Sequence, residues 1–270
     1  MIQPQLHFYD FGEGVKAFSS TRHGGFSKGH YAAFNINHYC GDSEDNIAKN
    51  RSLLCDLLGI GEDRLLMPHQ VHLTEMVTID EVFIGLSAEE QKARLEGVDA
   101  LMTNLKGVCI GVSTADCIPV LLYDKVHHAS CAIHAGWRGT VKRIAEKAVK
   151  KMTGVYGSRP EDMLAQIGPG IHLESFEVGD EVFEAFEKEG FTMDTISKRY
   201  PSKDGSAQEK WHIDLPECNR LQLISAGVPE SQVSVSPVCT YMQADTYFSA
   251  RRLGIESGRI FTGIILRRRG

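Results

Sequence analysis

The sequence lacks the features that would place the protein in a membrane or on nucleic acid. No apolar run approaches the roughly 20 residues needed to cross a bilayer. The first residues also lack the basic and apolar regions of a secretory signal. Acidic residues outnumber basic ones, 35 to 29, and the formal net charge of −6 disfavours a general nucleic-acid binder. We therefore expect a cytoplasmic protein with no membrane and no nucleic-acid partner.

Two patterns of metal-binding and disulfide-forming residues are also missing. The seven cysteines include no C-x-x-C pair, and the 11 histidines include no H-x-H pair. An odd cysteine count in a chain of this length favours reduced thiols over a disulfide framework. Without H-x-H pairs, the ligands for a cluster of several coppers look too few. Cys55, Cys109 and Cys131 lie in apolar stretches, where cysteine is typically a small buried residue.

No internal repeat, low-complexity tract or Pro- and Ser-rich linker divides the 270 residues. Ser87 and Glu90 form a capping box that predicts a short helix. Helical patterns occur at residues 43–58, 181–189 and 216–226, and strand-like runs at residues 15–20, 98–102, 108–112, 163–167, 233–235, 239–241 and 260–266. We therefore predict an α+β fold with a single domain spanning residues 1–270.

One predicted hairpin gathers residues that can do chemistry. Two apolar runs, residues 120–123 and 129–133, are separated by a short polar turn, which predicts an antiparallel hairpin. Cys117 precedes the first strand and His134 closes the second, so the hairpin brings a thiol and an imidazole to the same end of the sheet. A glycine-rich segment follows, and we predict a helix that starts just after it with Thr140 as its N-cap.

A second histidine is a candidate partner of this pair. His69 and His72 are three residues apart just before a strand-like run, and side chains at this spacing lie on opposite faces of a strand. We therefore expect at most one of them to point at the hairpin. Cys117, His134 and one further histidine make a Cys/His2 set. Such a set leaves one tetrahedral position open on Zn2+, as catalytic zinc sites do, and it also suits trigonal copper.

The same cysteine and histidine allow an interpretation without metal. Cys117 activated by His134 is the nucleophile and base arrangement of a cysteine hydrolase or amidase, for example one that acts on a cell-wall precursor. Such an enzyme has no need of His72, so the position of His72 discriminates between the two hypotheses. On spacing alone both stay open.

Two further regions can bind an anion. Arg22 and His23 lie in a loop with paired glycines, which let a ligand approach the backbone closely. Arg51 falls near the inward face of the helix predicted at residues 43–58. Because an unpaired buried charge is costly, we expect Arg51 to be paired inside the protein or to reach a ligand.

Five motifs occur in order along nearly the whole chain, and together they resemble the YfiH/YlmD/FAMIN family, whose members have long been labelled polyphenol oxidoreductase or laccase-like. They are TRHGG, QVH, TADC, AIHAGWRG and IGPG, at residues 21–25, 70–72, 114–117, 132–139 and 167–170. The chain departs from the usual pattern at Leu73, where the family often has glycine, and at His69, which is not a general family residue.

The resemblance implies a layered α/β/β/α sandwich of mixed sheets, with zinc bound by His72, Cys117 and His134. It also implies phosphorolysis of adenosine, inosine, guanosine and S-methyl-5'-thioadenosine to the base and (thio)ribose 1-phosphate. Deamination of adenosine is the second implied reaction. Copper-dependent oxidation of phenols is the older interpretation of the family.

These reactions predict roles for the remaining polar side chains. Deamination at a metal site needs a nearby acid that moves protons, and Asp116 is the candidate. Phosphorolysis needs a phosphate clamp, for which Arg51 and Arg138 are the first candidates, with Arg22 and His23 as alternatives. Purine nucleosides and phosphate are the expected small-molecule partners, and the sequence carries no signature of an oligomeric state.

Overall fold

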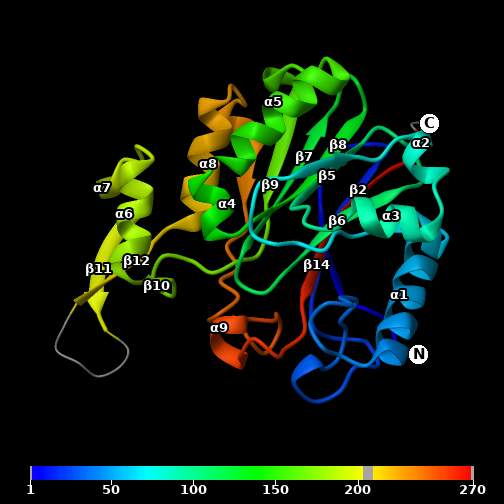
Figure 1. Ribbon diagram of the computed structural model, residues 1–270, viewed down its shortest axis with the longest axis horizontal. Helices are drawn as coiled ribbons and strands as arrows, with labels where there is room; N and C mark the ends of the chain where they lie inside the picture. Colours follow the sequence, from blue (N-terminus) through cyan, green and yellow to red (C-terminus); the bar gives the residue numbers. More distant parts are fainter. Residues whose placement is uncertain (1, 203–208, 269–270) are drawn as a thin grey trace.

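The computed structural model describes residues 2–202 and 209–268, and Figure 1 shows its arrangement of helices and strands. The five-stranded sheet has the order β1-β2-β14-β6-β3. Its strands are β1 (Leu6–Tyr9), β2 (Val15–Ser20), β14 (Ile260–Leu266), β6 (Cys109–Thr114) and β3 (Leu65–Leu66). All neighbouring pairs in this sheet are antiparallel except β3 with β6.

The six-stranded sheet has the order β13-β9-β7-β8-β5-β4. Its strands are β13 (Val233–Val235), β9 (Met163–Ile167), β7 (Ile118–Asp124), β8 (Ala129–Ala135), β5 (Ala100–Thr103) and β4 (Met76–Thr78). The outer pairs, β13 with β9 and β4 with β5, are parallel, and the inner pairs are antiparallel. Both large sheets are therefore mixed, as expected.

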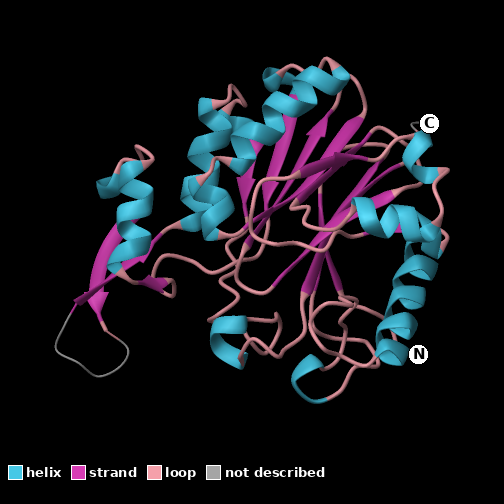
Figure 2. Cartoon of the chain, in the orientation of Figure 1, coloured by secondary structure: helices cyan, strands magenta, loops and turns pink. Residues whose placement is uncertain are grey.

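The two large sheets pack against each other, and helices cover their outer faces (Figures 1 and 2). Side chains of Ile110 and Val112 on β6 meet Leu121 and Ala132 of the other sheet in the core between them. The outer face of the six-stranded sheet packs on α4 (Trp137–Val141), α5 (Ile144–Tyr156) and α8 (Leu215–Ser225). The outer face of the five-stranded sheet packs on α1 (Glu44–Leu58). This order is the predicted α/β/β/α sandwich, so the α+β class is confirmed.

Two peripheral groups of elements complete the fold. A small sheet with the order β10-β12-β11 projects at one side together with α6 and α7 (Figure 1). Its elements are β10 (Glu177–Val178), α6 (Asp180–Lys188), α7 (Met193–Ile196), β11 (Ser197–Pro201) and β12 (Glu209–Ile213). Three short helices lie elsewhere: α2 (Glu81–Ile84), α3 (Ala88–Arg94) and α9 (Ala250–Leu253).

The local predictions with clear boundary signals are confirmed. Helix α1 ends where Gly59 adopts a left-handed conformation (φ 64°), which only glycine reaches without strain. The capping box of Ser87 and Glu90 is present at the start of α3. Cys55, Cys109 and Cys131 are buried, as predicted for small apolar residues. Strands β2, β9, β13 and β14 occupy the predicted residues.

Two local predictions are wrong. The helix predicted from residue 141 with Thr140 as N-cap begins earlier, at Trp137, and breaks at Arg143, whose φ of 63° is left-handed. Thr140 lies inside α4, and its buried hydroxyl accepts a hydrogen bond from Asn219 instead of capping a helix. The predicted strand at residues 239–241 is a turn with one bridge, between Cys239 and Gly170.

In the part of the chain that the structure describes, no helix has both the length and the apolar surface that crossing a bilayer would require.

Candidate functional site

The β7–β8 hairpin places Cys117 and His134 at one end of the six-stranded sheet. Pro119 is paired with His134 and Ile118 with Ala135 across the two strands, and Cys117 directly precedes β7. The hairpin is therefore confirmed, and it brings the thiol beside the imidazole as the sequence predicted.

His72 joins this pair from a loop that precedes β4. The ligand atoms of His72, Cys117 and His134 all lie within 4.8 Å of one another. The two imidazole rings meet edge to face, with centroids 4.7 Å apart. His134 is buried, Cys117 is half-buried and His72 is exposed, so the cluster opens toward solvent on the His72 side. Within residues 2–202 and 209–268, no second cluster of three such ligand side chains occurs.

The carboxylate of Asp99 holds both histidines, and sequence reasoning missed it. It accepts a hydrogen bond from the Nδ1 of His134 at 2.7 Å, and from the backbone amides of His72 and Leu73 at 3.0 and 2.7 Å. Because the carboxylate only accepts, His134 carries its proton on Nδ1 and turns Nε2 toward the cluster. The available signal was a lone aspartate in an apolar strand, which must find donors.

The electrostatics of Asp99 agree with this role. Burial by itself raises the pKa of the carboxyl group, but the hydrogen bond and the charge of His134 and the amide donors of His72 and Leu73 outweigh burial and lower the pKa. Asp99 therefore stays ionised at neutral pH and keeps accepting all of these hydrogen bonds.

The backbone of His72 has an unusual conformation that places its side chain in the cluster. This residue has φ of 63°, a strained value for a residue other than glycine, and the amides donated to Asp99 keep it there. The neighbouring Gln70 fixes the same loop to β6, because its side-chain amide both donates to and accepts from the backbone of Ser113. The loop that carries His72 is thus held at two points.

Two glycines leave the space that the cluster needs. A Cβ on Gly136 would lie 2.8 Å from Cδ2 of His72 and 3.2 Å from the Sγ of Cys117. A Cβ on Gly170, in the IGPG motif, would overlap the Cδ1 of Ile118 beside the turn that carries Cys117. Both motifs therefore have a steric reason to contain glycine at these positions.

The thiol and the imidazole of the hairpin shift each other's pKa. Burial by itself raises the pKa of Cys117, but the charge of His134 and hydrogen bonds from His134 and His72 outweigh it and lower the pKa to about 6. Burial by itself lowers the pKa of His134, but the charge of Cys117 and the hydrogen bond to Asp99 raise it to about 9. A thiolate is therefore available at neutral pH, as metal ligation or nucleophilic attack requires.

The cluster lies in a cavity of about 410 Å3, a size that holds a small organic ligand. Its lining comes from loops at residues 37–40 and 69–72, from the ends of β6 and β8, and from the segment around α9. The lining residues are Asn37, Tyr39, Cys40, His69, Gln70, His72, Ser113, Thr114, Ala115, Cys117, His134, Ala250, Ile255 and Arg259. We call this cavity the metal-site cavity. Besides Cys117, His72 and His134, it is lined by neutral polar side chains, His69 and one arginine.

His69 lines this cavity without joining the three ligand side chains. Its Nδ1 is 2.6 Å from the carboxylate of Glu96, and its ring stacks on Tyr39 with centroids 4.1 Å apart. One histidine of the pair, His72, therefore points at the hairpin, in line with the expectation of at most one.

Asp116 adjoins Cys117, but its carboxylate is directed elsewhere. One oxygen accepts from the hydroxyl of Thr240 and the other from the backbone amide of Arg251, each at 2.7 Å. Its φ of 93° marks a tight turn just before β7. These contacts make Asp116 an anchor between the Cys117 turn and the segment around α9. Its role as a proton carrier stays a prediction.

Arg22 and His23 lie in a loop that does not line the metal-site cavity. The guanidinium of Arg22 donates to the backbone carbonyls of Ala32 and Ala244 and lies over the ring of Phe248. His23 is exposed. Arg22, next to the paired glycines, therefore connects two segments that are distant in the sequence. Anion binding by this loop stays a prediction.

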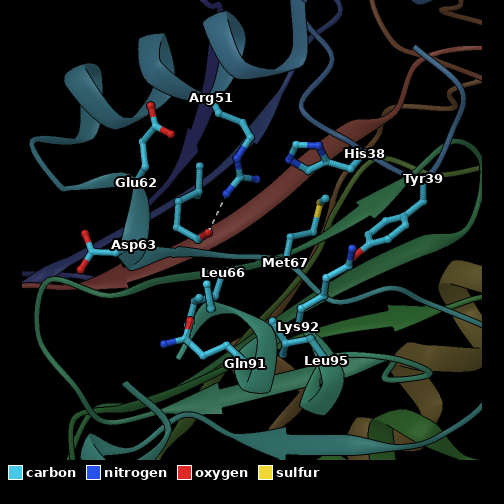
Figure 3. Close-up of a pocket in the computed structure, with 12 residues that line it drawn as sticks. His38, Tyr39, Arg51, Glu62, Asp63, Leu66, Met67, Gln91, Lys92 and Leu95 are labelled. Carbon is cyan, nitrogen blue, oxygen red and sulfur yellow. Dashed lines mark hydrogen bonds between the residues drawn. The ribbon is translucent and has the colours of Figure 1, made fainter. Parts of the chain in front are cut away.

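Arg51 lines a second, smaller cavity of about 200 Å3 (Figure 3), hereafter the α1 cavity. Its guanidinium donates to the carbonyl of Leu65 at 2.9 Å, so it is paired inside the protein. The α1 cavity also contains Glu62, Asp63 and Lys92, so both charge signs are represented. The structure separates Arg51 from the metal-site cavity, and the phosphate clamp predicted for it stays a prediction.

Arg138 lies near the hairpin but at the surface. It is exposed, and its guanidinium stacks on the ring of Trp137, 4.3 Å from the centroid. It does not line the metal-site cavity. The arginine that does line it is Arg259, which sequence reasoning missed because it stands alone in a short loop before β14.

The donor set fits a metal ion. A thiolate and two imidazoles are the ligands that zinc and copper take in proteins, and three of them leave a coordination position open. The Asp99 carboxylate supports His134 as carboxylates commonly support metal-bound histidines. The three side chains lie in a cavity at the ends of β6 and β8, and their donor set with one open position is that of a catalytic type of metal site.

The chain belongs to the family described as multi-copper polyphenol oxidoreductase laccase, which matches residues 16–267. Two relatives are similar over nearly their whole length. A purine nucleoside phosphorylase from Bacteroides thetaiotaomicron is 46% identical over 93% of this chain and 92% of its own. An adenosine deaminase RL5 from an unknown prokaryotic organism is 45% identical over 96% of this chain and 97% of its own.

The fold has a close counterpart among solved structures. The YfiH protein of Bacillus licheniformis, described as hypothetical, superposes with a TM-score of 0.85 at 26% identity, covering 96% of this chain and 99% of its own. The resemblance drawn from the five motifs is therefore confirmed at the level of family and fold.

Proposed function

We propose that the protein is a metal-dependent purine nucleoside enzyme that catalyses phosphorolysis and also deaminates adenosine. The observation that carries this proposal is the open cluster of His72, Cys117 and His134 in a cavity of nucleoside size. The two similar relatives support the substrate class, because one is named a purine nucleoside phosphorylase and the other an adenosine deaminase. Adenosine, inosine, guanosine and S-methyl-5'-thioadenosine are the proposed substrates, with phosphate as the second substrate.

We assign His72, Cys117 and His134 as ligands of a zinc ion. When bound, zinc polarises substrate atoms and lowers the pKa of water, which suits attack on the ring carbon that bears the amino group of adenosine. Asp99 keeps the proton of His134 on Nδ1 and so directs Nε2 to the cluster. The loop that carries His72 is held by hydrogen bonds of Asp99 and Gln70, and it lies on the exposed side of the cluster.

The competing metal is copper, which the family description suggests. In the described residues the single three-ligand cluster offers one metal position, whereas a multi-copper centre needs several. Elemental analysis of the purified protein separates the two metals. About one zinc per chain supports the proposal, and stoichiometric copper together with phenol oxidation would replace it.

The decisive assay follows hypoxanthine release from inosine with and without phosphate and with and without a chelator. We expect phosphate-dependent release that a chelator stops and zinc restores. In Cys117→Ala we expect bound metal to disappear and activity to fall by more than about 100-fold, beyond the usual effect of residues that only support a ligand. Cys131→Ala, on the same strand as His134, is the matched control and should keep metal and activity. Release that is unaffected by chelator contradicts the proposal.

A second candidate function has one observation in its favour. The lowered pKa of Cys117 beside His134 is what a cysteine hydrolase or amidase needs. That enzyme would keep its activity in the presence of chelator and lose it on alkylation of Cys117. The presence of His72 in the cluster favours the metal enzyme, because a Cys/His pair needs no second imidazole.

A further inference from the structure

We propose that Thr114 and Arg259 form the phosphate subsite of the metal-site cavity, an inference that rests on the proposed phosphorylase function. Thr114 lies in β6, and Arg259 directly precedes β14, the neighbouring strand of the five-stranded sheet. Thr114 ends β6 and is paired with Ile260, the first residue of β14, so Arg259 lies directly beside the end of β6. Both residues line the metal-site cavity.

Thr114 has a hydroxyl group that the protein itself does not satisfy. Its side chain is 1% exposed, and its Oγ1 has no hydrogen-bond partner among the described residues. Leaving a buried polar group without a partner costs about 1–3 kcal/mol. Because Thr114 lines a cavity, a bound ligand is the natural partner for this hydroxyl.

Arg259 presents a cation that no carboxylate neutralises. In the part of the chain that the structure describes, it forms no ion pair, and none of the residues lining the metal-site cavity is an aspartate or a glutamate. Its Nη1 donates to the carbonyls of Ser257 and Gly258 and its Nη2 to that of Ile255. These bonds fix the plane of the guanidinium and leave Nε–H without a partner among the described hydrogen bonds. A fixed guanidinium of this kind recognises phosphate oxygens.

The other polar groups on this wall are already paired. The Nδ2 of Asn37 donates to the hydroxyl of Ser113 at 2.6 Å, and its Oδ1 accepts from the backbone amide of Tyr39. The Gln70 amide is occupied by the backbone of Ser113. Thr114 and Arg259 therefore combine a buried hydroxyl that has no partner among the described residues with a cation, while the side-chain amides of Asn37 and Gln70 beside them are already hydrogen-bonded. A cation next to a free hydroxyl donor is the composition expected for an anion site.

This subsite affects only one of the two proposed reactions. In phosphorolysis an oxygen of hydrogen phosphate bonds to C1' of the ribose while the bond from C1' to the purine nitrogen breaks. The proton of hydrogen phosphate passes to the released base, so atoms and charge balance. Deamination consumes water and releases ammonia, and it uses no phosphate. A change at the phosphate subsite should therefore separate the two activities.

The test compares Thr114→Val and Arg259→Gln with wild type. We expect the KM for phosphate in inosine phosphorolysis to rise at least about fivefold in Thr114→Val and at least about tenfold in Arg259→Gln, as loss of a neutral and a charged hydrogen bond implies. Adenosine deamination should stay within about twofold. Thr114→Ser and Arg259→Lys should restore part of the phosphate affinity. Thr114→Val should not lower the melting temperature, because its hydroxyl has no partner to lose in the folded chain.

Arg252→Ala is the matched control. Arg252 is an exposed arginine of the nearby α9 that packs over Tyr241 outside the cavity, so both activities should persist. A parallel loss of phosphorolysis and deamination in both variants, with an unchanged KM for phosphate, would show a structural role and overturn the inference.

Calorimetric titration with inorganic phosphate separates this inference from the proposed function. Wild type should bind phosphate, and Arg259→Gln should bind at least about tenfold more weakly. If wild type binds phosphate in this way but releases no base from inosine, the proposed function fails and the subsite stands. If wild type cleaves inosine with phosphate but both variants keep its phosphate affinity, the subsite fails and the function stands.

Discussion

The metal-site cavity and the α1 cavity share the side chain of Tyr39, yet they differ in how their polar groups are satisfied. The metal-site cavity is lined by Cys117, His72 and His134 together with Thr114, whose hydroxyl has no partner among the described residues, and Arg259, which has no carboxylate beside it in the lining. In the α1 cavity, the guanidinium of Arg51 bonds to the carbonyl of Leu65 and has Glu62 near it (Figure 3). The difference lies in the charges around each arginine: carboxylates of Glu62 and Asp63 share the α1 cavity with Arg51, whereas no carboxylate among the described residues lines the metal-site cavity with Arg259. An arginine in a cavity is therefore evidence for an anionic ligand only where no carboxylate shares that cavity.

Thiol reactivity gives the largest contrast between the two regions. Burial raises the pKa of Cys55, beside Arg51, to about 11, whereas that of Cys117 is lowered to about 6. At pH 7 the thiolate fractions differ by about 10^4, and the lower intrinsic nucleophilicity of Cys117 removes about 10^2 of this advantage. In chelator-treated protein we expect iodoacetamide to modify Cys117 about 100 times faster than Cys55, as measured by peptide mass spectrometry.

The pH dependence has a definite sign. Above pH 6 the Cys117 thiol is ionised, so its alkylation rate should be level, and the rate should fall about tenfold per pH unit below that value. Restoring zinc should protect Cys117 and leave Cys55 unchanged. Equal modification of both residues would show that the environment of Cys117 does not differ from that of a buried thiol.

Removing a carboxylate should also affect the two cavities unequally. Asp99→Asn puts an amide where His134 and three successive backbone amides donate. We expect metal affinity to fall about 10- to 100-fold, as is typical when the partner of a metal-bound histidine is changed. Glu62→Gln, in the α1 cavity, should leave metal affinity unchanged. Competition with a chromophoric chelator measures both, and tight zinc binding by Asp99→Asn would contradict the role assigned to Asp99.

A substitution in the α1 cavity should change stability more than catalysis. Arg51→Met keeps much of the aliphatic volume but removes the hydrogen bond to Leu65, so we expect the free energy of unfolding to fall by about 1–2 kcal/mol. The KM for phosphate should stay within about twofold. Urea titration and inosine phosphorolysis provide the two readouts. A tenfold rise in this KM at unchanged stability would restore Arg51 to the clamp role that the sequence predicted.

The smallest expected effect is at the shared wall. Tyr39 stacks on His69, and such a pair contributes about 0.5–1.5 kcal/mol. Tyr39→Ala should therefore raise the KM for inosine by about fivefold, because it frees His69 and removes the wall between the cavities. Tyr39→Phe keeps the ring and should change the KM by less than twofold. If both variants match wild type, the two cavities do not depend on this wall.

Features that depend on neighbours in the sequence were predictable. The hairpin follows from two apolar runs around a short turn, and its antiparallel pairing necessarily brings Cys117 and His134 to one end. The family motifs gave the fold class and the third ligand side chain, His72. One local prediction failed: the helix after the hairpin begins at Trp137 and not at residue 141. Gly136 and Gly139 let the chain pass close to the loop of His72, so the helix starts before the predicted cap is reached.

The sequence by itself therefore determined most strands of the two large sheets, the end of α1 at Gly59 and the cysteine and histidine pair, since hydrophobic periodicity and turn chemistry act over a few residues. Only the tertiary structure decided which charged groups line the metal-site cavity and which are paired elsewhere. Asp99 reaches donors on two segments, 26 and 35 residues away, and Arg259 enters the cavity because β14 returns beside β6. Such contacts depend on how the two sheets pack. No local pattern distinguishes Arg259 from Arg51 until the packing has placed carboxylates in the cavity of Arg51 and, among the described residues, none in that of Arg259.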